Sequence, residues 1–558
     1  MKYSFYYCIF SYIFILLFSF SCALLASAPT PENFLRCLSQ HYSNTSSISK
    51  LVYTPNDPSY FSCLNFSIQN PRFSSHFTPK PQVIITPFHV SHVQGAVYCS
   101  RKHKMQFIVR SGAHDYEGLS YTSEVPFVIL DLNNLRSINI DVENSTAWCE
   151  SGATVGEVYY NIAKKSSNLG FPAGICPTVG VGGHFSGGGY GTILRKYGLA
   201  ADNIIDAELV DVDGRILDRK SMGEDLFWAI RGGGGASFGV VVSWKIKLVQ
   251  VPSIVTVFNV QRFLAQDGTE LVHRWQEVAH KFHEDLFVRL VLQAISLDGG
   301  KKTIQVTFNS MFLGDVDSLL MLMQKSFPEL GLVREDCIQM SWIESTLFFN
   351  GFPSGQSLEV LLDRVTETRS SKAKSDYVKE PIPVEGLEGI WERLFEEEVG
   401  RGMLIMTPYG GKMDEISESK IPFPHRKGNI YQIQYLIFWD AKENVTESQK
   451  HISWIRRLYS YMTPYVSKSP REAYFNYRDL DIGTNNIKGR TSYAEAGIWG
   501  TKYFKNNLNK LVQVKTTVDP TNFFQNQQSI PPYDYVEEQL SLKIYKYGYV
   551  YPQLLLSH

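Results

Sequence analysis

The chain has 558 residues, of which 44% are hydrophobic and 20% are charged, so it can bury a large core and is too long for one compact unit. Its 54 Lys and Arg residues are balanced by 55 Asp and Glu residues. This balance excludes a charge field that would favour nucleic acid or an anionic membrane surface. We therefore expect two or more lobes and no nucleic-acid partner.

Residues 1–28 have the organisation of a secretory signal peptide. Lys2 precedes an apolar stretch from Cys8 to Phe20, and small residues from Ala26 to Ala28 precede Pro29. The stretch is shorter than the ~20 residues that span a bilayer, so a membrane anchor is the less favoured interpretation. We expect no membrane contact after signal removal and a final location in the apoplast or the vacuole. Four N-glycosylation sequons fit this route: Asn44, Asn65, Asn144 and Asn444.

An α+β lobe is predicted for residues 29–253. A helix is expected to begin at Thr30, Pro31 and Glu32, where a capping hydroxyl precedes a proline and an acid in the first turn. Apolar runs and turn residues then predict alternating strands and helices. The strands are Val83–Thr86, Phe107–Arg110 and Phe127–Leu132, the helix is Ser91–Lys102, and Glu208–Asp218 forms a hairpin around Asp213 and Gly214.

A second lobe, residues 254–468, is predicted where the pattern changes to long alternating strands separated by amphipathic helices, which is typical of an antiparallel sheet. Residues 469–535 return to tyrosines and polar loops, and we expect them to close over the first lobe. The tail, residues 536–558, has no functional interpretation. The strands expected in the second lobe are Phe287–Ile295, Lys302–Leu313, Met403–Thr407 and Ile430–Phe438, and the helices are Leu271–Phe282, Val316–Lys325 and Glu447–Tyr461.

Glycine is concentrated in three stretches: Arg110–Gly118 (RSGAHDYEG), Gly174–Gly191 (GICPTVGVGGHFSGGGYG) and Arg231–Gly239 (RGGGGASFG). Backbone without side chains can approach a pyrophosphate closely, and its N–H groups can form an anion-binding nest. The stretches therefore favour a phosphate-bearing cofactor, with tight turns between packed strands as the alternative. The sequence offers no convincing P-loop lysine pattern and no convincing dinucleotide-fold GxGxxG.

An ordered set of motifs extends the argument: RSGAHDYEG, CPTVGVGGH, GGGYG, KYGLAADN, RGGGGASFG, PFPHRKGN, NYRDLD and SIPP. From about Pro31 to Pro532 the chain resembles the berberine bridge enzyme family of plant FAD-linked oxidases, and in particular its cannabinoid-synthase-like members. The resemblance implies an α+β, two-lobed FAD-linked oxidase fold of the vanillyl-alcohol-oxidase type. A PCMH-type FAD domain would form the first lobe and an antiparallel-sheet substrate domain the second, in a monomer.

The resemblance also implies that FAD is attached twice, at the family's histidine and cysteine, which fall on His114 and Cys176. Imidazole and thiolate both add to the electron-poor isoalloxazine ring, and two tethers raise its reduction potential. A disulfide between Cys37 and Cys99 is implied as well. The other flavin-contacting positions that it implies are Arg110, Ser111, Gly112, Ala113, Asp115, Val179, Gly180, Gly183, Ser186, Tyr190, Gly191, Val240, Tyr474 and Asn476.

Two of these positions carry further information. Ala113 stands where the family usually has glycine before the anchoring histidine, and its methyl group is expected to tighten that loop. Val179 matches the position at which relatives with valine react with oxygen, whereas those with leucine tend not to. This favours an oxidase that releases hydrogen peroxide, and a simple packing role for Val179 is the alternative.

The strand Ile430–Phe438 carries two amides on one face, Gln432 and Gln434, because side chains alternate along a strand. This pattern favours a face turned to a cavity, and a solvated edge strand is the alternative. In alkaloid-bridging relatives a glutamate base matches Gln434, but an amide cannot take a proton in that way. In relatives that oxidise lignin-type alcohols a tyrosine matching Tyr190 is the base, and the supporting lysine matches Gln432, so it is absent here.

In the cannabinoid synthases the base is a tyrosine that matches Tyr477, which this sequence keeps within YFNYRDLD. We therefore assign Tyr477 as the base, with Tyr190 as second candidate and Tyr116 in the pocket wall. A free tyrosine has a pKa near ~10, so the site must stabilise phenolate by hydrogen bonds or positive charge. Arg289 can supply that charge or bind a phenolate substrate, and a solvated surface residue is its alternative. No metal site is expected at His280 and His283, because nothing completes a ligand set.

The combined interpretation is an FAD-linked oxidase of a prenylated phenolic or alkaloid-type plant metabolite, or another small aromatic or terpenoid substrate. Hydride would pass to flavin N5 and O2 would restore the flavin. Two other enzyme classes stay open on the same scaffold: a redox-neutral FAD-dependent cyclase of the Diels-Alderase type, and a carbohydrate or alcohol oxidase. A non-catalytic storage or defence role is a third interpretation.

Overall fold

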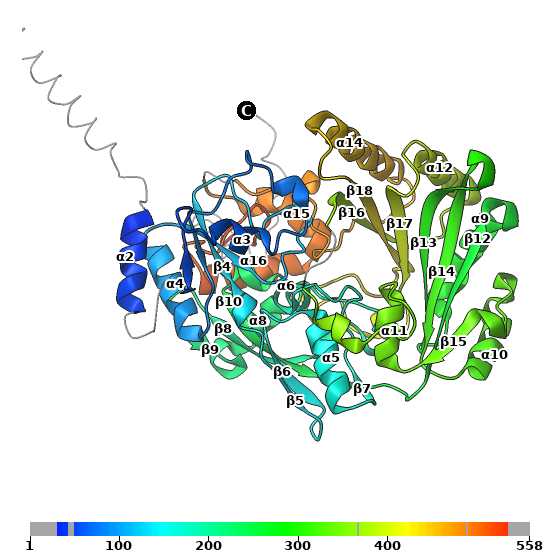
Figure 1. The fold of residues 1–558 in the computed structure, drawn as a ribbon, viewed down its shortest axis with the longest axis horizontal. Helices are drawn as coiled ribbons and strands as arrows, with labels where there is room; N and C mark the ends of the chain where they lie inside the picture. The colour runs from blue at the N-terminus through cyan, green and yellow to red at the C-terminus, as the bar shows by residue number, and fades with distance from the viewer. Residues whose placement is uncertain (1–30, 43–49, 365–367, 487–488, 534–558) are drawn as a thin grey trace, which may run out of the picture.

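The computed structural model describes residues 31–42, 50–364, 368–486 and 489–533, which form two lobes (Figure 1). The first lobe holds the N-terminal and C-terminal parts of the described chain, and the second holds the middle. The predicted signal peptide, Asn44 and the tail lie outside the described residues. Within the described ranges, no helix combines the length and the apolarity that crossing a bilayer requires.

Two sheets form the framework of the first lobe. In the smaller one, β2 and β3 both pair parallel with β4, and β1 pairs antiparallel with β2 at the edge. All strand pairs of the larger one are antiparallel. In sheet order the strands are β1 (Val52–Tyr53), β2 (Val83–Ile85), β4 (Phe127–Asp131) and β3 (Gln106–Arg110), and then β5 (Ile138–Asp141), β6 (Thr146–Glu150), β10 (Val240–Lys247), β8 (Ile204–Val210) and β9 (Ile216–Leu217).

Helices cover these sheets and connect their strands. The crossover from β2 to β3 is α4, which buries Val93, Ala96 and Val97 against the smaller sheet. A disulfide between Cys37 and Cys99 joins α2 to α4, so the implied bridge is present. The helices of this part are α2 (Pro31–His41), α3 (Tyr60–Asn65), α4 (Val90–Lys102), α5 (Val155–Lys165), α6 (Val181–Ser186), α7 (Leu194–Tyr197) and α8 (Arg219–Ile230), and a short ribbon pairs β7 (Leu169–Gly170) with β11 (Val249–Gln250).

The second lobe is one seven-stranded antiparallel sheet with helices on its outer face (Figure 1). Alternate residues such as Leu290, Phe308 and Ile433 pack into the core under these helices, and the opposite face turns to the first lobe. In sheet order the strands are β15 (Cys337–Met340), β12 (Val255–Phe263), β14 (Lys302–Phe312), β13 (Leu286–Ser296), β17 (Gly402–Pro408), β18 (Tyr431–Trp439) and β16 (Ser370–Val378). The helices of this part are α9 (Gly268–Val278), α10 (Val316–Ser326), α11 (Trp342–Phe349), α12 (Val384–Phe395), α13 (Lys412–Glu415) and α14 (Val445–Tyr461).

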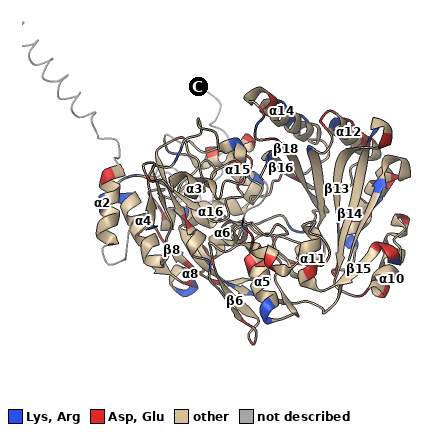
Figure 2. Ribbon diagram, viewed as in Figure 1, with Lys and Arg blue, Asp and Glu red and all other residues tan. Residues whose placement is uncertain are grey.

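The chain then returns to the first lobe through α15 (Tyr493–Phe504) and α16 (Asn507–Val518). Trp499 and Leu511 of these helices share a core with Phe227 of α8. The α+β organisation and the antiparallel second sheet are confirmed, and the predicted elements lie where expected with small shifts at their ends. One exception is the helix predicted to Phe282, which changes to a 3₁₀ turn at Ala279. Charges of both signs are dispersed over both lobes (Figure 2), in line with the net charge of −1.

Candidate active site

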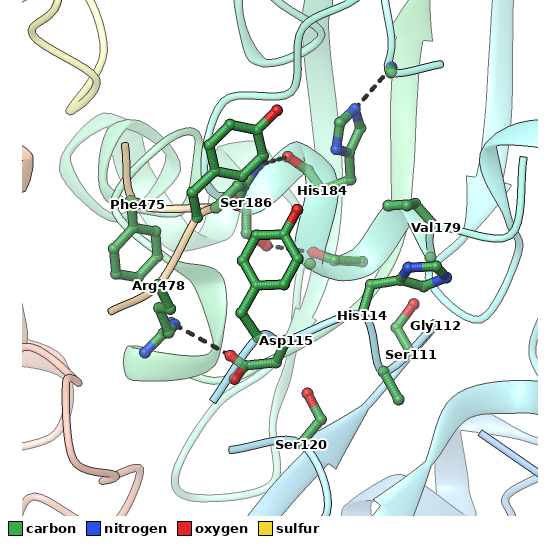
Figure 3. Close-up of a pocket in the computed structure, with 18 of the residues that line it drawn as sticks. Ser111, Gly112, His114, Asp115, Ser120, Val179, His184, Ser186, Phe475 and Arg478 are labelled. Atoms are coloured by element: carbon green, nitrogen blue, oxygen red, sulfur yellow. Dashed lines mark hydrogen bonds and ion pairs between the residues drawn. The ribbon is translucent and has the colours of Figure 1, made fainter. Parts of the chain in front are cut away.

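A cavity of about 580 Å³ is lined by residues of both lobes and of the C-terminal segment. The first lobe contributes the loop after β3, the segment around α6 and the residues before β10. The second lobe contributes the inner face of β13, β17 and β18, and the loop 474–478 completes the wall. All three glycine-rich stretches therefore reach one cavity, as a single cofactor site requires. Figure 3 shows the part of the wall that carries His114, Val179, His184 and Arg478.

The first two glycine loops approach each other as closely as backbones can. A Cβ atom on Gly112 would lie 2.1 Å from the backbone nitrogen of Gly180, and a Cβ on Gly180 would lie 2.1 Å from the nitrogen of Gly112. Gly183 lines the cavity, and the space where its Cβ would lie is open. Bare backbone at the edge of open space lets a diphosphate approach its N–H groups closely. The cradle therefore fits FAD.

The two predicted flavin anchors lie on either side of one threonine. Thr178 Oγ1 is 2.9 Å from His114 Nε2 and 3.5 Å from Cys176 Sγ. Burial lowers the pKa of His114 to about 4, so the imidazole is neutral at neutral pH. Cys176 is an unpaired, exposed thiol in the cavity wall. A neutral imidazole and an accessible thiol on the same wall are the donors that attachment to one flavin ring would use.

Ala113, directly before His114, has a φ of 55° and is buried. This is the left-handed region, where an alanine is less stable than in the right-handed region by roughly 1–2 kcal/mol. The departure from glycine therefore places backbone strain in the loop that carries the first predicted anchor.

Three tyrosines lie together in the cavity. The hydroxyl oxygens of Tyr190 and Tyr477 are 2.5 Å apart, and Gln434 Nε2 donates to the hydroxyl of Tyr116 at 2.6 Å. The rings of Tyr116 and Tyr477 are 5.8 Å apart. Burial raises the pKa of all three phenols. At Tyr190 part of this rise in pKa is offset by the hydrogen bonds from Tyr477 and Thr407 and by the charge of Arg289, which favours Tyr190 as the member of the pair that holds a negative charge.

A buried ionic network fixes the two loops that carry these residues. Lys372 of β16 pairs with Glu117 of the first glycine loop and, at 2.8 Å, with Asp479 of the loop that follows Tyr477. Lys374 pairs with Asp479 at 2.6 Å and with Asp481 at 2.8 Å. Both lysine side chains are only 2% exposed, so their charges must be matched inside the protein. The network therefore ties the second lobe to both loops.

A second link joins the same two loops at the cavity wall. Asp115, between His114 and Tyr116, lies 3.5 Å from Arg478, which follows Tyr477 (Figure 3). Both residues of this pair line the cavity themselves, so the wall is held together from within.

The cavity wall contains most of the predicted site residues, and four of the predicted residues are not part of it. Arg110 is buried on an ion pair with Asp131, and Val240 packs in the core. Gly191 packs against a backbone carbonyl, and Gln432 is buried with both amide atoms unpartnered among the described residues. The predicted residues that line the cavity are Ser111, Gly112, Ala113, His114, Asp115, Tyr116, Cys176, Val179, Gly180, Gly183, Ser186, Tyr190, Arg289, Gln434, Tyr474, Asn476 and Tyr477.

Several residues in or directly beside the cavity wall were not predicted. Thr178 lies inside the motif CPTVG, so its position beside Cys176 was available as a signal. His184 accepts a hydrogen bond from the backbone nitrogen of Gly174 at 2.8 Å, and Thr407 reaches the wall from β17. The pairing of β17 with β18, which sequence does not reveal, brings Thr407 beside the tyrosines. Among the sequons, Asn65, Asn144 and Asn444 are exposed.

Comparison with known proteins identifies two family matches. Residues 81–219 match a family described as FAD binding domain, and residues 473–531 match one described as berberine and berberine like. The first match covers two of the glycine loops and both predicted anchors. The second covers the loop that carries Tyr477.

The chain is also similar to other plant proteins over nearly its whole length. It is 54% identical over 518 residues to cannabidiolic acid synthase-like 1 of Cannabis sativa, covering 91% of this chain and 94% of that protein. It is 54% identical over 515 residues to tetrahydroberberine oxidase of Berberis wilsoniae, covering 92% and 96%.

Among solved structures, BBE-like 28 from Arabidopsis thaliana matches with a TM-score of 0.84 and 52% identity, covering 90% of this chain and 100% of that one. The grass pollen allergen Phl p 4.0202, described as a glucose dehydrogenase, matches with a TM-score of 0.84 and 45% identity, covering 90% and 99%.

Proposed function

Since the chain belongs to the berberine bridge enzyme family of FAD-linked oxidoreductases, we propose that it is a secreted oxidase of a prenylated phenolic or alkaloid-type plant metabolite. The observation that carries this proposal is the pair formed by Tyr190 and Tyr477, which lies in the same cavity wall as His114 and Cys176. Two linked phenols beside the flavin anchors can remove a substrate proton as an adjacent C–H is oxidised.

His114 and Cys176 each form one covalent bond to the flavin in this proposal, and Thr178 sets their spacing. The support is the position of Thr178 Oγ1 within 2.9 Å of His114 Nε2 and 3.5 Å of Cys176 Sγ. The backbone of Gly112, Gly180 and Gly183 receives the diphosphate. Bound FAD supplies a hydride acceptor and, by reaction with O2, releases hydrogen peroxide.

Tyr477 and Tyr190 work as a proton relay. The reactive form is the one in which Tyr190 has lost its proton: its phenolate accepts the proton of Tyr477 across the 2.5 Å hydrogen bond while the Tyr477 oxygen takes the proton of a substrate phenol or alcohol. Arg289 supports this direction because its charge opposes the rise in the pKa of Tyr190. Tyr116, held by Gln434, packs against Tyr477 and orients it. The oxidised substrate then cyclises or is released.

The substrate wall favours an aromatic or terpenoid molecule. Opposite the tyrosines, β17 and β18 present Ile405, Leu436 and Phe438, and β13 adds Phe287. Apolar side chains with a few placed polar groups are typical of small-molecule sites. These residues exclude water and hold an apolar substrate against the polar end formed by the tyrosines.

Val179 favours oxygen as the electron acceptor, because it keeps a small side chain next to the anchors in the cavity wall. A Phl p 4 variant with valine in place of isoleucine is described as a glucose oxidase, whereas the wild-type protein is described as a glucose dehydrogenase. Passage through the secretory route is supported by the disulfide of Cys37 and Cys99 and by exposed sequons. The amide Oδ1 of Asn444 caps α14, which leaves its Nδ2 for glycan attachment.

Anaerobic mixing of the purified holoprotein with candidate substrates tests the proposal. Loss of the flavin absorbance, followed by its return and by hydrogen peroxide when air is admitted, is the expected result. Product without loss of absorbance would instead support a redox-neutral cyclase. Loss of absorbance with sugars and not with phenolics or alkaloids would support the carbohydrate oxidase, which the glucose-oxidising relative favours.

A further inference from the structure

Arg289, which is half-buried in the cavity wall, uses fewer of its donors than the fully buried Arg195 and Arg426. Arg195 donates to the backbone carbonyls of Phe282 at 2.7 Å and Tyr409 at 2.9 Å, among others, and Arg426 pairs with Asp202 at 2.7 Å. Arg289 makes one hydrogen bond, from Nε to the side chain of Asn309 at 2.7 Å, and no ion pair with any described residue. Its terminal N–H groups therefore keep their capacity to bind an anion.

A polar ladder across three strands holds this guanidinium in place. Arg289 of β13 lies opposite Asn309 of β14, which lies opposite Asn259 of β12. Asn309 accepts from Arg289 and donates to Asn259 Oδ1 at 2.5 Å. The ring of Phe349 lies 5.2 Å from the guanidinium carbon. Because Nε of Arg289 donates to Asn309, the two terminal nitrogens of the guanidinium are the donors that remain for a ligand.

The cavity supplies no carboxylate to neutralise this charge. Asp115 is the one acidic residue among the described residues of the wall, and it lies beside Arg478. Tyr190 and Tyr477 are neutral in the resting site, because burial raises the pKa of both phenols. Burial also lowers the pKa of Arg289 to about 10, which still leaves it cationic at neutral pH. A half-buried cation in the cavity wall without an ion-pair partner is available to an anion, so a ligand that brings one gains affinity through a charge-assisted pair.

We propose that Arg289 binds a carboxylate of the substrate, so that the enzyme of the proposed function acts on an aromatic or terpenoid acid. The reaction in this inference rests on the proposed function, whereas the carboxylate-binding site rests only on the surroundings of Arg289. Two terminal nitrogens in one plane match the two oxygens of a carboxylate, whereas a phenolate offers only one. A carboxylate is also ionised in water at neutral pH, and a phenol with a pKa near ~10 is not.

The arrangement of the wall fits such a molecule. Arg289 and Asn309 lie on the β13 and β14 side of the sheet, while Ile405, Leu436 and Phe438 lie on β17 and β18. An acid that places its carboxylate on Arg289 lays its apolar part across the neighbouring strands. The side chain of Arg289 thus orients the substrate as well as attracting it.

Two unreactive probes of the same shape test this site without turnover: hydrocinnamate, which carries a carboxylate, and hydrocinnamide, which carries a neutral amide. Each is titrated into the flavin-loaded protein, and binding is followed by the change in the flavin absorption spectrum and by calorimetry. We expect the acid to bind roughly 10- to 100-fold more tightly than the amide, as a charge-assisted bidentate pair implies. We expect Arg289→Gln to remove this preference and Arg289→Lys to retain part of it, because lysine keeps the charge and loses the planar fork.

Gln293→Leu is the matched control, since Gln293 lies on the same face of β13 and pairs with Gln305 at 3.1 Å. It should leave the preference for the acid unchanged. Retained covalent flavin in every variant shows that the site is folded. Equal affinity for the acid and the amide, a preference that survives in Arg289→Gln, or no binding of the acid would each overturn the proposal. Because no probe is oxidised, these results are independent of whether the chain is an oxidase.

Discussion

Replacing Tyr477 with phenylalanine removes one oxygen from the cavity and leaves the ring in place. The lost hydroxyl is the one that lies 2.5 Å from the hydroxyl of Tyr190, so the relay loses the member that touches the substrate. The ring still packs against Tyr116 at 5.8 Å and Tyr474 at 5.0 Å, so the wall keeps its shape. General-base catalysis contributes roughly 10²- to 10⁴-fold, and we expect flavin reduction in Tyr477→Phe to slow by that factor.

The pH dependence of flavin reduction follows from the same geometry. Burial raises the pKa of Tyr477 well above its ordinary value, and that of Tyr190 above its own. A base acts in its deprotonated form, so the rate should rise with pH across the neutral range, without a plateau below the ordinary tyrosine pKa of ~10. Tyr477→Phe should flatten this profile.

Anaerobic stopped-flow measurements on Tyr477→Phe, Tyr190→Phe and the double variant separate a relay from two independent groups. In a relay, the double variant is no slower than the slower single variant, because either substitution breaks the same path. Tyr159→Phe, a buried tyrosine whose hydroxyl donates to the carbonyl of Gly174 outside the relay, is the matched control. Wild-type reduction rates in Tyr477→Phe, or losses that multiply in the double variant, would refute the reasoning.

Three further substitutions test other parts of the account. Lys372→Met leaves Glu117 with Arg72 alone and Asp479 with Lys374 alone, and we expect it to destabilise the fold by about 1–3 kcal/mol in chemical denaturation; an unchanged midpoint would mean that the network is not matched as described. Val179→Ile should slow reoxidation of reduced flavin by O2 and leave its anaerobic reduction unchanged, and equal reoxidation rates in the two proteins would remove Val179 as the oxygen determinant. Ala113→Gly should relieve the left-handed strain at φ 55° and raise the free energy of unfolding by about 0.5–1 kcal/mol, whereas a loss of stability would show that this alanine is not strained.

Much of the fold was accessible from local pattern because most elements bury one regular face. The alternation in β18 separates Ile433 from Gln434, and the structure places the first in the core and the second in the cavity. The alternation could not show that Gln432, which lies on the same face of β18 as Gln434, is buried outside the set of residues that line the cavity. That outcome depends on where the first lobe meets the sheet, which no local sequence feature specifies.

The strand β16 was missed for a physical reason. Its sequence, SSKAKSDYV, alternates lysine with small residues and suggests a solvated segment, yet all of its residues are buried. The anions that make this burial tolerable, Glu117 and Asp479, lie more than one hundred positions away in the chain. Asn309 was missed for a similar reason, since its role depends on a partner, Arg289, that only the folded chain brings to it.

The central claim is that one FAD is held by both His114 and Cys176, and denaturation of the purified protein tests it most directly. The account predicts that flavin absorbance stays with the unfolded polypeptide in the wild type. It also predicts that the absorbance stays in each of His114→Ala and Cys176→Ala and leaves completely in the double variant. Release of all flavin from the denatured wild type, or retention in the double variant, would contradict the claim.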